Sequence, residues 1–250
     1  MNQTQTIQQT AHSELTARKD IWWFEPALVA LGFTAFIIYG TYRALENNFF
    51  AFGPYLSPFY SPYLNFSWWK FSPAFLILWI PGLFRATCYY YRKAYYRAYF
   101  ADPPACAVGH LGGNKYCGEN AFPLVLQNLH RYFFYLATIV LAILWYDTVK
   151  AFIFDGKFGI SLVSLIMLAN VLFLSAYSFG CHACRHLVGG RLDCFSQSCE
   201  TKTQFKLWNF VTKLNEHHMF WAWVSLFSVG FCDFYIRQVA SGAYPEVRFF

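Results

Sequence analysis

The residues best suited to chemistry lie in one short stretch, Cys181-His-Ala-Cys-Arg-His186. It places two cysteines and two histidines within six residues, where a long apolar run meets a basic loop. Thiolate sulfur and imidazole nitrogen are the protein ligands that zinc and iron–sulfur clusters use. The pattern therefore predicts a metal ion or a metal cluster held at the mouth of an apolar bundle.

If the stretch continues the preceding helix, its four candidate ligands divide between two helix faces. At 100° per residue, Cys181 and Cys184 lie about 60° apart on one side of the helix. His182 and His186 lie about 40° apart on another side. We therefore expect one centre to use one of these pairs, completed by side chains from other segments.

Two ligand sets follow, and the sequence leaves both open. The first set consists of Cys181, Cys184, His130 and His218. The second set consists of His182, His186, Cys88 and Cys106. Each set supplies two thiolates and two imidazoles, which is the ligand count of a Rieske-type 2Fe–2S cluster. The same ligand count suits a structural zinc site.

Plainer interpretations compete with a cluster. His182 and His186 can cap the end of their helix, where the helix dipole favours a cation. One b-type haem at this end is a further alternative, because four histidines are candidates for its axial ligands. They are His130, His182, His186 and His218. The other cysteines (Cys117, Cys194, Cys199 and Cys232) are expected to be free thiols, and His110 and His217 to be solvated.

The elements that must position these side chains are membrane helices. The chain has 250 residues, of which 57% are hydrophobic, 22% aromatic and only 13% charged. A soluble domain carries about twice that charged fraction. Five apolar segments are each about 20 residues or longer, enough to cross a bilayer. They run from about Pro26 to Leu45, Pro73 to Tyr91, Leu124 to Thr148, Ile160 to Cys181 and His217 to Val239.

We therefore predict an all-α membrane protein, a bundle of five transmembrane helices over residues 21–250 behind a polar tail at 1–20. Lysine and arginine divide 13 to 6 between the two sides of this arrangement. The positive-inside rule then places the N-terminus and the Cys/His segments in the cytoplasm, as in a multi-pass protein of the plasma membrane. Basic residues that flank apolar spans do not predict nucleic-acid binding.

The connecting segments carry fewer indications. Residues 47–72 read as a loop rich in proline and aromatic residues, and Asp155-Gly-Lys157 as a short turn. Residues 189–213 read as a polar loop. Asp233 and Arg237 stand at i and i+4 in the last span, where the two charges can pair.

Several longer motifs resemble a known family. They are Thr87-Cys-Tyr-Tyr-Tyr-Arg-Lys-Ala-Tyr-Tyr-Arg97, Pro103-Pro-Ala-Cys106, Gln127-Asn-Leu-His-Arg-Tyr132, Cys181-His-Ala-Cys-Arg-His-Leu-Val-Gly-Gly-Arg191 and His218-Met-Phe-Trp-Ala-Trp-Val-Ser-Leu-Phe-Ser228. Together they resemble the single-chain membrane anchor of a bacterial succinate dehydrogenase of the actinobacterial kind. The resemblance runs from about residue 20 to the C-terminus.

The resemblance implies a role in respiration. The subunit would dock a flavoprotein and an iron–sulfur protein, and electrons from succinate would reach a quinone in the membrane. It also implies a Rieske-like cluster embedded in the anchor in place of haem. Arg85, Tyr89, Arg131 and Tyr132 are the candidates to hold the quinone. The chain has no Gly-x-Gly-x-x-Gly dinucleotide fingerprint, so we do not expect it to oxidise succinate alone.

Overall fold

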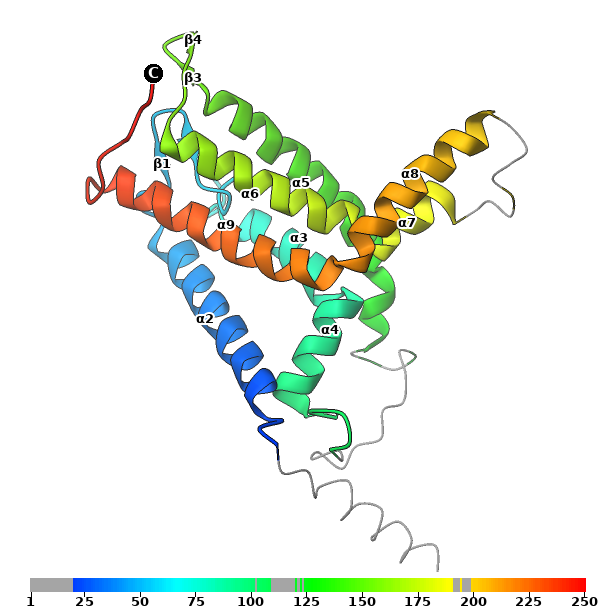
Figure 1. Cartoon of the computed structure of the whole chain (residues 1–250). Helices are drawn as coiled ribbons and strands as arrows, with labels where there is room; N and C mark the ends of the chain where they lie inside the picture. The colour runs from blue at the N-terminus through cyan, green and yellow to red at the C-terminus, as the bar shows by residue number, and fades with distance from the viewer. Residues whose placement is uncertain are drawn as a thin grey trace, which may run out of the picture.

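The computed structural model describes residues 20–101, 103–108, 120, 122, 124–190, 194 and 199–250, although the side chains of 124 and 199–201 are not described. In Figure 1, α5 (His130–Lys150), α6 (Leu162–Phe179) and α9 (His218–Ala240) run side by side from the end that holds the C-terminus, while α2 (Phe24–Glu46) splays away from them toward the opposite end. The predictions for the polar tail before Asp20, for His110 and for Cys117 lie outside the described residues, as does the side chain of Cys199.

Four described helices are long and apolar enough to cross a membrane: α2 (Phe24–Glu46), α5 (His130–Lys150, with the 3-10 turn Leu124–Leu129 before it), α6 (Leu162–Phe179) and α9 (His218–Ala240). The second predicted span is shorter than expected, because its apolar helix α3 (Phe75–Ala86) has 12 residues. The prediction of an all-α membrane fold is confirmed. The described strands form two short hairpins, β1 (Ala51–Phe52) with β2 (Tyr55–Leu56), and β3 (Ile153–Phe154) with β4 (Lys157–Phe158).

The helices pack around an aromatic core. Helix α6 lies between α5 and α9, while α3 packs against α5 and α2 against α9. Buried Phe33, Phe84, Phe134, Tyr177 and Leu226 belong to one core cluster near the end that carries the candidate ligands. Apolar side chains also cover the outside of the bundle, as Ile37 and Ile38 do at 60% and 64% exposure. An apolar exterior of this kind matches the hydrocarbon of a bilayer.

We call the end that holds Cys88 and Cys181 the inner end, and the opposite end the outer end. At the outer end the loop after α2 folds over the bundle. Asp233 and Arg237 are 0% and 2% exposed there, and their side chains pair at 3.0 Å, as predicted. Tyr39 donates to Asp233 at 2.7 Å, Ser57 donates to the same carboxylate, and the Arg237 guanidinium donates to the carbonyl of Asn48. These partners fasten the loop and α2 to α9.

Two helices break at the inner end, each at a cysteine. Helix α3 ends at Ala86, and α4 (Tyr89–Tyr95) begins directly after Cys88, followed by the π-helix η1 (Tyr96–Phe100). Helix α6 ends at Phe179, and α7 (His182–Gly189) begins directly after Cys181. Both cysteines have extended backbone, with φ/ψ of −69°/131° and −68°/145°. The expectation of one continuous helix through Cys181–His186 is therefore wrong, and so is the division of its ligands between two faces.

Gly180, directly before the second break, allows α8 to pack close to the end of α6. A Cβ atom at this position would lie 2.7 Å from the carbonyl oxygen of Ala176 and 3.2 Å from Leu214, so a larger residue would force the chains apart. The side-chain amide of Asn215 donates to the carbonyl of Gly180 at 2.8 Å, which satisfies an acceptor freed by the end of the helix.

The expectation of a polar loop over residues 189–213 is also wrong for its second half. Helix α8 (Cys199–Glu216) packs antiparallel to α7 in a helical hairpin. Arg185 of α7 stacks its guanidinium 4.5 Å from the centre of the Trp208 ring, and its Nε donates to Thr212 at 3.0 Å. The many polar residues of α8 hid a narrow apolar stripe at helical spacing, of the kind that predicts an amphipathic helix.

Candidate metal centre and apolar cavity

The breaks at Cys88 and Cys181 open a cavity of about 450 Å³ at the inner end of the bundle. Its walls come from α4 and the residues before it, the start of α5, the α6–α7 break and the start of α9. The lining residues are Thr87, Cys88, Tyr89, Tyr90, Arg92, Gln127, His130, Cys181, His182 and His218. The chain has eight cysteines and seven histidines, and two of these cysteines and three of these histidines line this one cavity.

His130 and Cys181 form the first of two Cys–His pairs. The Nε2 atom of His130 lies 2.9 Å from the sulfur of Cys181. On the other side of the ring, Nδ1 lies 2.9 Å from the hydroxyl of Thr87, which itself donates to the carbonyl of Leu83 at 2.7 Å. Because that hydroxyl proton is already used, Nδ1 carries the proton and Nε2 keeps its lone pair. A histidine ligand oriented by a hydrogen bond at its other nitrogen is typical of metal sites.

Cys88 and His218 form the second pair, with the Cys88 sulfur 3.6 Å from Nε2 of His218. His218 is 1% exposed, and its ring lies between Tyr177, 4.9 Å away, and Tyr90, 5.0 Å away. Its Nδ1 has no hydrogen-bond partner among the described residues. Two aromatic neighbours therefore fix the plane of this imidazole, and its Nε2 is directed at sulfur.

Burial keeps both cysteines protonated in the absence of a cation. It raises the pKa of Cys181 to about 12, with the nearby Cys88 sulfur as a second cause, and it raises the pKa of Cys88 as well. Backbone amides oppose this effect, those of Ala183 and Cys184 at Cys181, and those of Tyr91 and Tyr90 at Cys88. Amide donors next to a buried sulfur stabilise a thiolate once a metal displaces its proton.

The chemistry and placement of these side chains fit a metal centre, with one restriction. In the part of the chain that the structure describes, no three His, Cys, Asp or Glu side chains converge on one point closely enough to hold a single ion. The ligands instead stand as two pairs on the walls of a shared cavity.

The cavity draws on both predicted ligand sets. Cys181, His130 and His218 come from the first set, and Cys88 and His182 come from the second. Cys184 is buried but does not line the cavity, and Cys106 is exposed outside it. His186 lies outside it too, with its Nδ1 atom 3.2 Å from the Arg131 guanidinium. Thr87, which orients His130, was missed, although it directly precedes Cys88 in the sequence.

The four predicted quinone residues do not share one described cavity. Arg85 turns toward α9, where it donates to the carbonyl of Ala222 at 3.1 Å and to Ser225 at 2.9 Å. Tyr89 lines the metal cavity and is 61% exposed, while Tyr132 is 64% exposed. Among the four, Arg85 alone lines the second large cavity.

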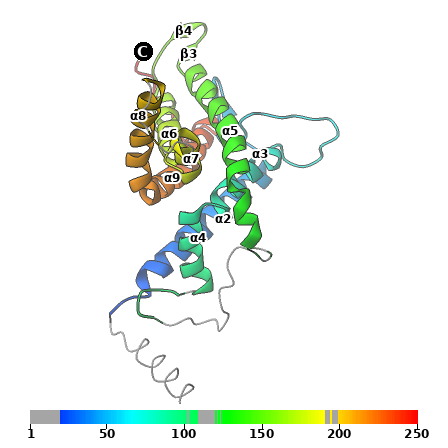
Figure 2. The same ribbon diagram turned by 90° about the vertical axis from the view of Figure 1, so that its right-hand side faces the viewer.

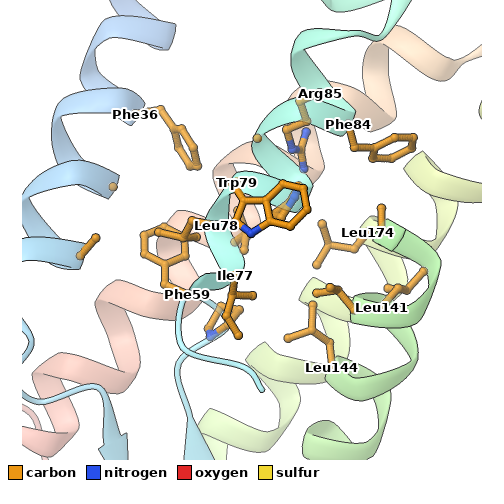
Figure 3. A pocket seen from close by; sticks show the side chains of 18 of the residues that line it. Phe36, Phe59, Ile77, Leu78, Trp79, Phe84, Arg85, Leu141, Leu144 and Leu174 are labelled. Carbon is orange, nitrogen blue, oxygen red and sulfur yellow. The ribbon is translucent and has the colours of Figure 1, made fainter. Parts of the chain in front are cut away.

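The second cavity has a volume of about 460 Å³ and surrounds α3 within the bundle. Figure 3 shows Trp79 at its centre, Phe36 and Phe59 on one side, and leucines including Leu141, Leu144 and Leu174 on the other. Arg85 lies at the end nearest to Phe84 and is the one charged side chain among the described lining residues.

Two aromatic rings separate the two cavities. Phe84 lines the apolar cavity and stacks on His130 with ring centres 5.0 Å apart and planes 6° from parallel. Tyr177 lines the same cavity and stacks on His218, and the Arg85 guanidinium lies 4.5 Å from the centre of the Tyr177 ring. Each histidine of the Cys–His pairs is therefore in contact with a ring that also borders the apolar cavity.

The apolar bundle and the paired ligands at one end define a multi-pass membrane protein with a candidate metal centre. A family model described as "Actinobacterial succinate dehydrogenase subunit SdhC" matches residues 24–242. Because the match covers most of the chain, the chain belongs to this family. The chain is also similar to one in the Mycobacterium smegmatis Sdh1 complex in the apo form. The two are 41% identical with a TM-score of 0.86, over 95% of this chain and 94% of that chain.

No curated protein sequence matches the chain significantly. The family match confirms the resemblance carried by the motifs around Cys88, His130, Cys181 and His218. The chain is the membrane anchor subunit of a succinate dehydrogenase, a multi-pass protein of the bacterial plasma membrane. Its partners are the flavoprotein and iron–sulfur subunits of that enzyme.

Proposed function

We propose that this anchor passes electrons from the partner iron–sulfur subunit to a membrane quinone, through a Rieske-like 2Fe–2S cluster held by Cys88, Cys181, His130 and His218. The observation that carries the proposal is the convergence of these two Cys–His pairs on one cavity. Two thiolates and two imidazoles are the ligand count of such a cluster. When bound, it would accept and release one electron at a time.

The protein's own contribution is to orient the ligands and to limit access of water. Thr87 holds His130 with Nε2 available, and the rings of Tyr177 and Tyr90 hold His218. Burial around Cys88 and Cys181, at 2% and 1% exposure, shields the charged thiolates from solvent. Amide donors near each sulfur compensate part of the cost of burying that charge.

We further propose that the quinone occupies the apolar cavity around α3. Its lining of Phe, Leu, Ile and Val side chains suits an isoprenoid tail, and Arg85 supplies a donor for a ring carbonyl at one end. The shared wall of Phe84 and Tyr177 supports this placement, because it separates the quinone from the ligands His130 and His218 by one layer of side chains.

Ligand substitutions in the assembled complex test the cluster. Cys88→Ser and Cys181→Ser should each lower the iron and acid-labile sulfide content of the complex by the equivalent of one binuclear cluster. Cys184→Ser and Cys232→Ser are matched controls, because both cysteines are buried outside the cavity. Equal iron content in all four variants would refute the proposed ligands.

The same preparation separates the alternatives. His130 and His218 line the same cavity, which also favours a b-type haem with these two histidines as axial ligands. A pyridine haemochrome assay detects such a haem. Zinc in place of the additional iron would indicate a structural site that carries no electrons. Both results contradict the proposed cluster without affecting the assignment of the chain as a membrane anchor.

A further inference from the structure

The α7–α8 hairpin is tied to the membrane boundary by both of its ends. Helix α7 begins three residues after the membrane span α6 ends at Phe179, and α8 ends at Glu216, two residues before α9 begins. In Figure 1 the hairpin leaves the inner end sideways and does not continue the direction of the bundle. Figure 2 shows α8 on the same side as α6 and α9, while α4 leaves the inner end elsewhere. With 18 residues, α8 extends about 27 Å from this anchoring point.

One face of α8 is covered by the protein itself. Val211 is buried, Trp208 lies under the guanidinium of Arg185, and Asn215 bonds to Gly180. At 100° per residue these three side chains fall within about 60° of the helix surface. The remaining described surface of α8 includes exposed side chains that can contact something outside the chain.

That remaining surface combines two stripes. Leu207 and Phe210 are 52% and 60% exposed and lie about 60° apart around the helix. Three exposed lysines (Lys202, Lys206 and Lys213) fall within about 40°. The centres of the two stripes lie about 90° apart, so the lysines flank the apolar stripe along its length.

We propose that α8 lies in the inner surface of the membrane and binds anionic lipid, with Leu207 and Phe210 among the acyl chains and the three lysines at the headgroups. A helix with an apolar face and adjacent basic side chains is typical of interfacial segments. The lysine stems can follow the apolar surface while their amines reach the phosphates. A protein partner suits this surface less well, because lysine is depleted at the core of protein–protein interfaces.

A photo-crosslinking amino acid placed in the complete complex tests this. Phe210 and Phe205 are both exposed phenylalanines of α8, but they lie about 140° apart around the helix. The photoreactive residue should therefore replace Phe210 in one variant and Phe205 in the other. Both complexes are reconstituted in nanodiscs that contain a mixture of phosphatidylcholine and phosphatidylglycerol.

The expected result is covalent lipid adducts at position 210 that are several-fold more abundant than at position 205 and enriched in phosphatidylglycerol. The enrichment should disappear when Lys202→Gln, Lys206→Gln and Lys213→Gln are combined with the photoreactive residue at 210. Adducts at 210 with a polypeptide of the partner subunits, equal lipid yields at both positions, or an unchanged lipid preference in the lysine variant would overturn the proposal.

Discussion

Thr87 decides which nitrogen of His130 faces the candidate metal cavity. Its hydroxyl accepts from Nδ1 because its own proton goes to Leu83. Thr87→Val removes this contact while keeping the shape of the side chain, so we expect the apparent affinity of the site for iron to fall about 10–100-fold. Iron content measured during titration with a chelator reports the change.

Thr138→Val is the matched control, since the Thr138 hydroxyl also donates to the carbonyl four residues earlier, at 2.8 Å, but does not line the metal cavity. If both variants release iron equally, Thr87 does not orient a ligand.

Tyr177 is a second single residue with a measurable role. It is 1% exposed, and its hydroxyl has no other hydrogen-bond partner among the described residues. Its proximity lowers the pKa of Cys88, so this hydroxyl is available to donate to the Cys88 sulfur when that thiolate binds a cluster. Hydrogen bonds to sulfur ligands raise the reduction potential of iron–sulfur clusters. Tyr177→Phe should therefore lower the potential found by redox titration, with iron content unchanged.

Tyr60→Phe serves as the comparison, because Tyr60 is equally buried but bonds to Arg43 and Ala44 at the outer end. A potential that does not move in Tyr177→Phe, with the cluster retained, would mean that this hydroxyl makes no bond to the ligand.

The residue types of the site were predictable, but their grouping was not. Cysteine and histidine near the ends of apolar runs indicated a metal site, and Cys88, Cys181, His130 and His218 were all candidates. The grouping depends on single extended residues between helices, at Cys88 and Cys181. The periodicity of apolar residues does not show where a helix breaks. The only local sign of the break at Cys181 in the sequence is Gly180, at the C-terminal end of α6.

At the scale of elements, the short helix α3 supplies many of the side chains that line the apolar cavity. A Cβ atom added at Gly82 meets no other atom within 4 Å, and Gly82 lines the cavity. Gly82→Phe should therefore fill the cavity without a backbone clash and sharply reduce succinate-dependent quinone reduction. Reduction of a water-soluble electron acceptor by the flavoprotein should continue.

Ile139→Phe is the control, because it also adds an aromatic ring to the bundle, but at a residue of α5 that is 59% exposed. Normal quinone reduction in Gly82→Phe would show that the quinone binds elsewhere.

The membrane spans were the easiest elements to predict, because about 20 consecutive apolar residues leave few alternatives to a membrane helix. The second span was predicted over Pro73–Tyr91, yet α3 ends at Ala86 and its continuation α4 turns away after Cys88. Helix α8 was missed altogether. Its apolar positions alternate with lysines and amides, so average polarity concealed the helical spacing that Trp208 and Val211 show.

At the scale of the whole molecule, the buried Asp233–Arg237 pair closes the outer end. Its contacts with Tyr39, Ser57 and Asn48 join α2, the following loop and α9. Asp233→Asn removes the fully buried partner of Arg237 and leaves it only the partly exposed carboxylate of Glu46, 3.6 Å from its guanidinium. Breaking a buried pair costs about 3–5 kcal/mol. We expect a large fall in the thermal unfolding temperature of the complex, with the iron content at the inner end unchanged.

Glu246→Gln provides the comparison, because Glu246 pairs at 2.9 Å with an Arg248 that is 47% exposed. The glutamine keeps a side-chain oxygen that can still accept the hydrogen bond from Tyr55. Such surface pairs contribute about 0–1 kcal/mol. Equal effects of Asp233→Asn and Glu246→Gln would mean that the buried pair does not hold the outer end together.

The central claim is that cysteine and histidine side chains of this subunit together bind a 2Fe–2S cluster. The most direct test is electron–nuclear double resonance on the reduced, intact complex, which detects nitrogen bound to a paramagnetic cluster. We predict strong couplings to two histidine nitrogens, with one coupling lost in His130→Gln and the other in His218→Gln. A reduced complex in which every paramagnetic iron–sulfur centre lacks directly bound nitrogen would contradict the account.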